Sequence, residues 1–316
     1  MRATEWWGKP GVFEHFALTT NMRAKDDPVY ASWLTHVGNG TAETTAELPD
    51  GRVLHPNVIE LPMSMTTPPN WDPADLLAWT FDGWESQALD NLRFFYADRA
   101  VVTPTNEAAK DVNDNMLQRL KATSPTKVSR SVDVAVTDSG DASAYTLEFL
   151  NSLESGGMPP HELHLCPGML CMLLRNYAPR KGLCNGTRLI VREMHKHLLL
   201  VQIVNGPHAG EFALLPRITC DSSGDAELPF VLRRQQFPIK PAWCMTINKS
   251  QGQTLGGKLG IYLPSPVFAH GQLYVAFSRA RLQQNVRVLM SDHNDKQASW
   301  REDSTVDSTR QFTFNM

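Results

Sequence analysis

Several common features are missing from this chain of 316 residues. No apolar stretch approaches the roughly 18 uncharged residues that a membrane-spanning helix needs. The amino terminus shows neither the long apolar core nor the small-residue cleavage site of a secretory signal. The five cysteines are odd in number and include no C-x-x-C pair, which favours reduced structural thiols. With 42% hydrophobic and 20% charged residues, the chain is predicted to be an intracellular globular protein.

The nucleotide-binding P-loop, G-x-x-x-x-G-K-[ST], is also missing. The segment from Gly252 to Lys258 comes close, but Leu259 stands where a P-loop carries the Ser or Thr that ligates Mg²⁺. A P-loop also joins a strand to a following helix. Here the order is reversed, because Pro241 suits the first turn of a helix and Gly252 the residue just past its end. We therefore expect a helix over residues 241–251, a loop, and then a buried strand, "LGIYLP".

Carboxylates are absent from residues 228–290, which contain 8 Lys and Arg residues and no Asp or Glu. The rest of the chain is acidic, with net charges of −9 over residues 1–227 and −2 over residues 291–316. A basic segment of this length favours a polyanionic partner, above all one that carries phosphates. A basic surface that is merely hydrated explains the charge equally well, so charge alone leaves both interpretations open.

The pattern of an α/β domain begins near residue 94. Residues 1 to about 90 are rich in Trp and Pro and show no clear periodicity. A short apolar strand then ends near Val102, and a Thr-Pro-Thr-Asn turn leads into a helix with Thr105 or Asn106 as its N-cap. The apolar stripe of this helix is formed by Ala109, Val112, Met116 and Leu120. The helix N-terminus could hold a phosphate, and an ordinary strand-helix unit without a ligand fits the pattern as well.

A second kind of pattern interrupts this domain. Residues 125–160 are rich in Ser, Asp and Gly, and we expect an excursion or linker there. Four short apolar runs follow, separated by turn signals such as the Asn-Gly pairs at 185–186 and 205–206, which predict a small antiparallel, barrel-like β module. Helix and strand alternate again after residue 237. We expect a helix in "SPVFAHGQLYVAFSRAR", a final strand in "NVRVLM" and a frayed polar tail from residue 291.

Two long strings near the carboxyl-terminal end are specific. They read "RRQQFPIKPAWCMTINKSQGQTL" and "GIYLPSPVFAHGQLYVAFSRAR". They closely resemble the last two helicase motifs of the petite-integration-frequency (Pif-type) DNA helicases, especially the branch encoded by Helitron transposons. The likeness extends back through "MLLRNYAPRKGLCNGTRLIV" and "VVTPTNEAAKDVNDNML" to "LTTNMRA", so it covers nearly the whole chain from Phe13 to Met290. The resemblance implies a superfamily-one, type B motor that moves 5′ to 3′ on single-stranded DNA.

The resemblance also implies an α/β fold with two RecA-like motor domains that hold ATP between them, and with a Src-homology-three-like barrel inserted in the second. On this basis residues 1–90 are a remnant of the first motor domain and its connection to the second. Residues 91–160 begin the second motor domain, residues 161–236 form the barrel, residues 237–290 complete the motor domain, and residues 291–316 are a polar tail. The family implies ATP, Mg²⁺ and single-stranded DNA as ligands. It also implies a nuclear or mitochondrial place and work in DNA unwinding, recombination, repair or telomere maintenance.

Two arginines match the family's ATP site. Arg279 in "FSRA" matches the arginine finger, and Arg23 in "NMRA" resembles a second arginine aimed at the same γ-phosphate. A planar, permanently charged guanidinium suits the charge-spread transition state of phosphoryl transfer better than an ammonium does. Gln272 shares a helix face with Arg279 and is expected to couple the ATP site to the DNA. Taken by itself, an arginine at such a place is more often an exposed solubilising charge.

The string "NKSQG" resembles the helicase motif that touches the DNA backbone. By this match Lys249, Ser250, Gln251 and Gly252 contact DNA through charge, hydroxyl, amide and close main-chain approach. Thr103 and Asn106 are expected to hold another phosphate. No residue is assigned to a metal, because the P-loop is absent and no apolar run ends in the paired acidic residues that hold Mg²⁺.

These departures from the family predict a carboxyl-terminal helicase half that is inactive alone. Nearly the whole first motor domain is expected to be lacking, and a truncated transposon copy, a mis-started gene model and a separate subunit all remain open. Two function classes follow. The chain belongs either to an ATP-dependent DNA helicase that needs a separate first motor domain, or to a non-catalytic module that binds single-stranded nucleic acid.

Overall fold

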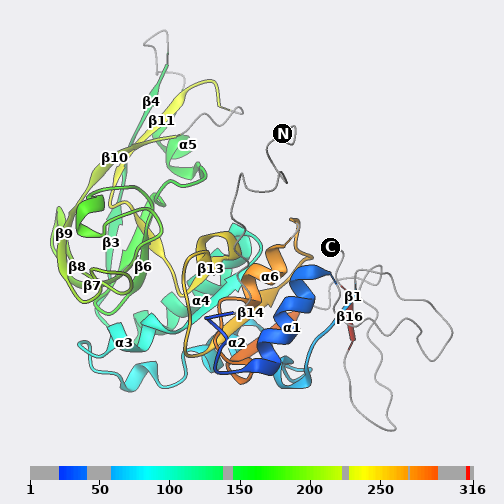
Figure 1. Cartoon of the computed structure of the whole chain (residues 1–316). Coiled ribbons are helices and arrows are strands. Elements are labelled where there is room, and N and C mark those ends of the chain that lie inside the picture. Colours follow the sequence, from blue (N-terminus) through cyan, green and yellow to red (C-terminus); the bar gives the residue numbers. More distant parts are fainter. Residues whose placement is uncertain are drawn as a thin grey trace, which may run out of the picture.

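A four-stranded parallel sheet forms the centre of the structure (Figure 1). The computed structural model describes residues 21–40, 58–137, 145–222, 228–269, 271–290 and 311–313, with the backbone alone for 58–60 and 311–313. The strand order is β13-β2-β14-β15. The strands are β13 (Cys244–Thr246), β2 (Ala100–Thr103), β14 (Leu259–Leu263) and β15 (Val286–Met290). Every residue of β2 is buried, because strands flank it on both sides and helices cover both faces.

Helices pack on the two faces of this sheet. The side chain of Val101 shares one core with α2 (Pro73–Thr80) and α4 (Asn106–Thr123). Its neighbours Ala100 and Val102 point to the other face and share a second core with α1 (Pro28–Asn39) and α6 (Gln272–Phe277). The remaining helical elements are α3 (Leu92–Ala97), α5 (Leu147–Ser152), η1 (Met63–Met65), η2 (Trp84–Ser86), η3 (Pro179–Lys181), η4 (Ile247–Ser250) and η5 (Gln283–Asn285).

The strand-turn-helix unit predicted near residue 100 is confirmed. Thr105 is the N-cap of α4, and its Oγ1 accepts a hydrogen bond from the backbone N–H of Ala108 at 3.3 Å. All four residues of the predicted apolar stripe are buried. The predicted strand "LGIYL" is β14, and the predicted strand "VRVLM" is β15. The latter is not the final strand, because β16 (Gln311–Thr313) follows and pairs with β1 (Val58–Glu60). The rest of the predicted tail lies outside the described residues.

The helix predicted over residues 241–251 is wrong. The segment instead forms β12 (Ile239–Pro241), β13 and the short 3-10 helix η4. Strand β13 pairs in parallel with β2, and its outer edge is satisfied by the side chain of Asn113, which bonds both the N–H and the C=O of Cys244 at 2.9 and 2.8 Å. Tertiary pairing of this buried run therefore outweighs the local helix signals. The helix predicted in "SPVFAHGQLYVAFSRAR" is also much shorter, since α6 comprises only its middle.

The β module is antiparallel, as predicted. Its largest sheet has the order β12-β6-β7-β8-β9. Its strands include β6 (Leu170–Leu173), β7 (Arg188–Met194), β8 (Leu198–Ile203) and β9 (Phe212–Pro216). Smaller sheets pair β3 (Lys127–Arg130) with β5 (Glu162–Leu165), and place β11 (Val231–Gln236) between β10 (Ile218–Asp221) and β4 (Val132–Val136). Residues 125–160 were expected to be an excursion or linker, and the described part is not a plain linker, because β3, β4 and α5 lie there.

A buried ion pair joins β4 to β11. Asp133 on β4 accepts three hydrogen bonds from Arg234 on β11, the shortest at 2.7 Å, and the two side chains are 0% and 1% exposed. Arg234 also donates to the carbonyl oxygens of Pro159 and Leu150, so it ties α5 to the sheet. All five cysteines are free thiols, as expected. No helix among the described residues is long and apolar enough to span a bilayer.

Candidate nucleic-acid interface

The loop between β13 and β14 carries the predicted DNA contacts. The side chains of Lys249 and Gln251 are exposed there. Gly252 has φ +81°, a left-handed conformation that favours glycine, and no atom lies within 4 Å of the place where a Cβ would be. Ser250 differs, because it is fully buried and its Oγ donates to the carbonyl oxygen of Ile247 at 2.6 Å. The loop thus exposes the charge of Lys249, the amide of Gln251 and the backbone of Gly252. The hydroxyl of Ser250 instead stabilises the turn by its hydrogen bond to Ile247.

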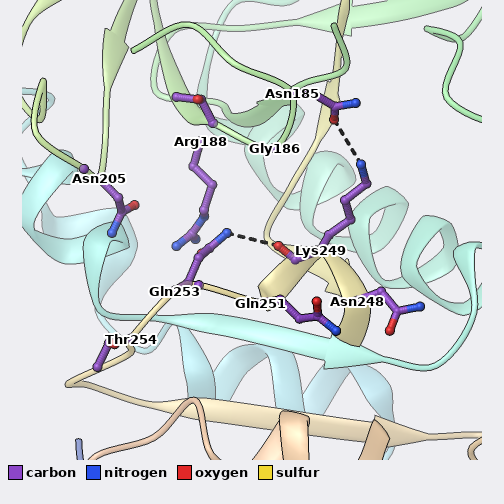
Figure 2. A pocket seen from close by; sticks show the side chains of 12 residues that line it. Asn185, Gly186, Arg188, Asn205, Asn248, Lys249, Gln251, Gln253 and Thr254 are labelled. Carbon is purple, nitrogen blue, oxygen red and sulfur yellow. Dashed lines mark hydrogen bonds between the residues drawn. The ribbon is translucent and has the colours of Figure 1, made fainter. Parts of the chain in front are cut away.

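This loop faces a pocket of about 570 Å³ between the parallel sheet and the β module (Figure 2). The module contributes the two Asn-Gly turns predicted from the sequence, in which Gly186 and Gly206 have φ of +92° and +90°. The Nζ of Lys249 donates to Oδ1 of Asn185 at 3.0 Å and so bridges the two sides. The lining residues are Asn185, Gly186, Thr187, Arg188, Asn205, Gly206, Asn248, Lys249, Gln251, Gly252, Gln253 and Thr254.

The pocket is positively charged, since its lining includes Lys249 and Arg188 and no Asp or Glu. Arg188 is only 1% exposed, and its guanidinium donates to the carbonyl oxygens of Tyr96 and Arg99 at 3.0 and 2.8 Å. Burial lowers the pKa of Arg188 to about 10, so the group stays charged at neutral pH. Beside the pocket, burial and then the charge of Lys249 lower the pKa of Lys240. An anion placed here would be attracted by both lysines.

The two predicted ATP-site arginines lie near each other and are joined to this loop. Nη1 of Arg23 donates to the carbonyl oxygen of Ser278 at 2.8 Å, and Nη2 of Arg279 donates to the hydroxyl of Ser278 at 2.8 Å. Arg23 also donates to Oγ1 of Thr254, and Arg279 to the carbonyl oxygen of Gln253. Burial, and then the charge of Arg23, lower the pKa of Arg279, which is 8% exposed. Arg279 is therefore not the exposed solubilising charge that its sequence position alone allowed.

The other predicted site residues do not line the pocket. Gln272 is 3% exposed and accepts a hydrogen bond from the N–H of Phe268 at 3.2 Å. Thr103 is fully buried at the end of β2. Asn106 is exposed at the first position of α4, and its Oδ1 accepts from Lys240 at 3.4 Å. Asn106 thus lies close to the basic side of the loop, whereas Gln272 and Thr103 are enclosed.

Comparisons with known proteins agree with the architecture. Residues 148–194 match the family model of the 2B domain of DNA helicase Pif1. The ATP-dependent DNA helicase PIF1 of Homo sapiens is 39% identical over 137 residues, which cover 41% of this chain and 20% of that protein. The Rattus norvegicus enzyme of the same name is 33% identical over 206 residues, which cover 57% of this chain and 31% of that protein.

The chain is similar in sequence to part of the Pif1-type helicases. It spans less than a third of the length of the two relatives above, 20% and 31%. The crystal structure of Pif1 helicase from Candida albicans matches 86% of this chain and 55% of its own, with a TM-score of 0.52 and 22% identity. The Bacteroides Pif1 complex with ADP-AlF3 and ssDNA matches 86% and 51%, with a TM-score of 0.51 and 21% identity. The predicted RecA-like α/β fold is confirmed, and an inserted Src-homology-three-like barrel is consistent with the match to the Pif1 2B domain.

Sequence reasoning missed most residues of this pocket, and four of them matter for its chemistry. Asn185 and Asn205 were identified only as turn formers, and nothing marked Arg188 or Gln253 as site residues. The Asn-Gly pairs are a usable signal, because an Asn ahead of a left-handed Gly is displayed at the tip of a turn. With a bridging lysine, a buried arginine and five side-chain amides, the pocket can bind phosphate oxygens and the hydrogen-bonding edges of bases.

Proposed function

We propose that this chain is the DNA-tracking half of an ATP-dependent, 5′-to-3′ DNA helicase of the Pif1 type. In this proposal Lys249, Gln251 and Gly252 bind the backbone of a single DNA strand. Arg23 and Arg279 stabilise the phosphoryl group of an ATP molecule that a first motor domain holds. Such a motor works where DNA is kept, in the nucleus or the mitochondrion, in unwinding, recombination, repair or telomere maintenance.

One observation carries the proposal, namely that the arginines and the loop share hydrogen bonds. Arg279 donates through Nη1 to the carbonyl oxygen of Gln253 at 3.2 Å and accepts through its own carbonyl oxygen from the N–H of Leu255 at 2.9 Å. Arg23 donates through Nε to Oγ1 of Thr254 at 3.0 Å. A guanidinium that turned toward a phosphate would break its bond to Gln253 or to Thr254 and loosen the loop. This contact is the kind that a motor needs to link nucleotide state to its grip on DNA.

The residues present do not by themselves make a site for ATP and Mg²⁺. The chain has no P-loop sequence, and the described residues contain no group of three His, Cys, Asp or Glu side chains that could hold a metal ion. We therefore propose that the phosphate and metal ligands come from the first motor domain, and that the chain alone does not turn over ATP.

A second function, binding of single-stranded nucleic acid without catalysis, is supported by the state of Arg279. Its guanidinium makes three internal hydrogen bonds, to Val275, Gln253 and Ser278. If no nucleotide binds beside it, the guanidinium of Arg279 has a purely structural role.

A DNA-stimulated phosphate-release assay separates the two functions. We expect background turnover from the chain alone, and turnover once a Pif1 first motor domain is joined to it. If the chain alone hydrolyses ATP and Arg279→Ala abolishes that activity, the proposal that the chain lacks the necessary phosphate and metal ligands is wrong. No turnover from the joined protein, with DNA binding intact, would favour the binding module.

A further inference from the structure

Three polar atoms at the pocket have no hydrogen-bond partner among the described residues. They are Nε of Arg188, Oδ1 of Asn205 and Oε1 of Gln253. Figure 2 shows the three side chains together on one side of the pocket, with Lys249 and Asn185 on the other. Buried polar atoms are nearly always paired in proteins, so three unpaired atoms at one pocket indicate a ligand that pairs with them.

The orientations of both amides are fixed by their other ends. Nδ2 of Asn205 donates to the carbonyl oxygen of Ala97 at 2.9 Å. Nε2 of Gln253 donates to the carbonyl oxygen of Lys249 at 3.4 Å. A flip of either amide would place its oxygen against a carbonyl oxygen. The unpaired amide atoms of Asn205 and Gln253 are therefore oxygens, which accept hydrogen bonds. This side of the pocket therefore offers two acceptors, and one donor from Arg188.

Phosphate does not match this set, because its oxygens only accept hydrogen bonds and would repel both amide oxygens. The edge of a nucleobase carries donors and acceptors together, and Asn and Gln are side chains that commonly read such edges. The volume of about 570 Å³ lies within the range of small-molecule sites and has room for a base with its sugar. Asn205 and Gln253 are both partly exposed and line the pocket, so a base that enters lies against their side chains.

We infer that this side of the pocket holds one unstacked base of the bound DNA strand, and that it prefers a base with an exocyclic amine. The inference rests on the proposed function, since the strand reaches the pocket through Lys249 and Gly252. The amine donates to the oxygens of Asn205 and Gln253, and a ring acceptor receives the N–H of Arg188. No aromatic residue lines the pocket, so edge contacts, not stacking, hold the base.

Cytosine and uracil make a matched pair of probes. They are the same size, but cytosine carries an amine where uracil carries a carbonyl oxygen, and it carries an acceptor nitrogen where uracil has N–H. Cytosine can satisfy both amide oxygens with its amine, whereas uracil offers one N–H and brings a carbonyl oxygen toward them.

The test measures the affinity of the full chain for oligo(dC) and oligo(dU) of equal length, at one salt concentration and slightly alkaline pH. We expect oligo(dC) to bind about tenfold more tightly, which is the discrimination of one good base-edge pair. Gln253→Met keeps the size of the side chain but removes the acceptor, so it should bring the two affinities together. Gln235→Met, on the exposed face of β11, is the control and should keep the preference.

The outcomes are separable. Equal affinities of the unaltered chain for both oligonucleotides would overturn the base pocket while leaving the proposed DNA binding in place. A preference that survives Gln253→Met in a variant that unfolds like the parent would also overturn it. Failure to bind either oligonucleotide would overturn the proposed function together with this inference.

Discussion

The guanidinium of Arg279 reaches the main chain of Gln253, where Nη1 lies 3.2 Å from the carbonyl oxygen. Gln253 belongs to the loop that faces the pocket, and Arg279 follows α6, which shares a core with α1. The backbone reinforces the link, since the N–H of Leu255 donates to the carbonyl oxygen of Arg279 at 2.9 Å. Arg279, which matches the arginine finger of the family, therefore also supports the loop.

Arg279→Ala should reduce stability even without nucleotide. The change removes three hydrogen bonds from a side chain that is 8% exposed and leaves enclosed acceptors without a donor. We expect a loss of about 1–3 kcal/mol in the free energy of unfolding, measured by urea denaturation. The exposed neighbour Arg281 provides the control, and Arg281→Ala should change stability by less than about 0.5 kcal/mol. Equal effects of the two changes would show that Arg279 is not a support of the loop.

In a protein joined to a first motor domain, Arg279→Ala and Arg23→Ala should each lower turnover roughly 10³-fold or more, as loss of an arginine finger does. Arg279→Lys should fail as well, because an ammonium cannot reproduce the planar fork. DNA affinity without nucleotide should change much less than turnover, although each substitution removes a bond to the loop. The measurements are kcat, ATP affinity and nucleotide-free DNA affinity. Near-normal kcat with lost DNA binding in Arg279→Ala would reverse the assigned roles.

Lys249→Ala should weaken binding to single-stranded DNA and change its salt dependence. Each phosphate contact contributes about −0.7 to the slope of log affinity against log salt, so removal of one contact should make the slope shallower by about that amount. Lys196→Ala, at an exposed turn between β7 and β8, is the charge-matched control and should leave the slope unchanged. Identical slopes for the Lys249 variant and the parent would exclude this lysine as a phosphate contact.

Asp133→Asn should be far more damaging than Asp221→Asn. The carboxylate of Asp133 is fully buried against Arg234, so its loss leaves an arginine charge buried without a counterion. Asp221 pairs with Arg233 at 2.8 Å, but those side chains are 43% and 49% exposed. We expect losses of about 3 kcal/mol or more for the first change and about 0–1 kcal/mol for the second. Chemical denaturation compares them, and similar losses would mean that the buried pair is not critical.

Stability should fall in mildly acidic solution partly through His164. Burial, and then the charge of Lys121, lower the pKa of His164 in the folded protein below its ordinary value of 6.5. As the pH falls, His164 is therefore protonated in the unfolded chain before it is protonated in the folded protein. Its contribution to the free energy of unfolding is present above pH 6.5 and is lost as the pH falls through the folded-state pKa. His164→Gln should make the decline shallower than in the parent, and the exposed His197→Gln should not. Unfolding midpoints measured across this range decide between these outcomes.

Sequence reasoning succeeded where local pattern and tertiary context agree. Thr105 caps α4, and the stripe of α4 faces the core, because a cap and a period of 3.6 residues are local properties. It failed over residues 241–251, where Pro241 and Gly252 suggested a helix. The decisive partners there are distant: β2 pairs with Cys244, and Asn113 satisfies the strand's edge.

The candidate site divided in the same way. Lys249, Gln251 and Gly252 were predicted because they lie within one short motif, and the structure places them on one pocket wall. The opposite wall was not predicted, because Asn185 and Asn205 reach the pocket only through the folding of the β module. The burial of Ser250 also escaped prediction, since a serine beside a lysine gives no local sign of which way its hydroxyl points.

The middle place of β2 in the sheet has a consequence for biosynthesis. Both of its neighbours are made much later by the ribosome, since Val101 pairs with Cys244 and Val102 pairs with Met245 and Ile261. Until those residues emerge, a strand that is entirely buried in the folded protein has no partner strand to pair with, and such nascent strands are prone to aggregation. The early part of the chain should therefore depend on chaperones during translation. A product that terminates before β13 should accumulate as insoluble material instead of as a smaller folded domain.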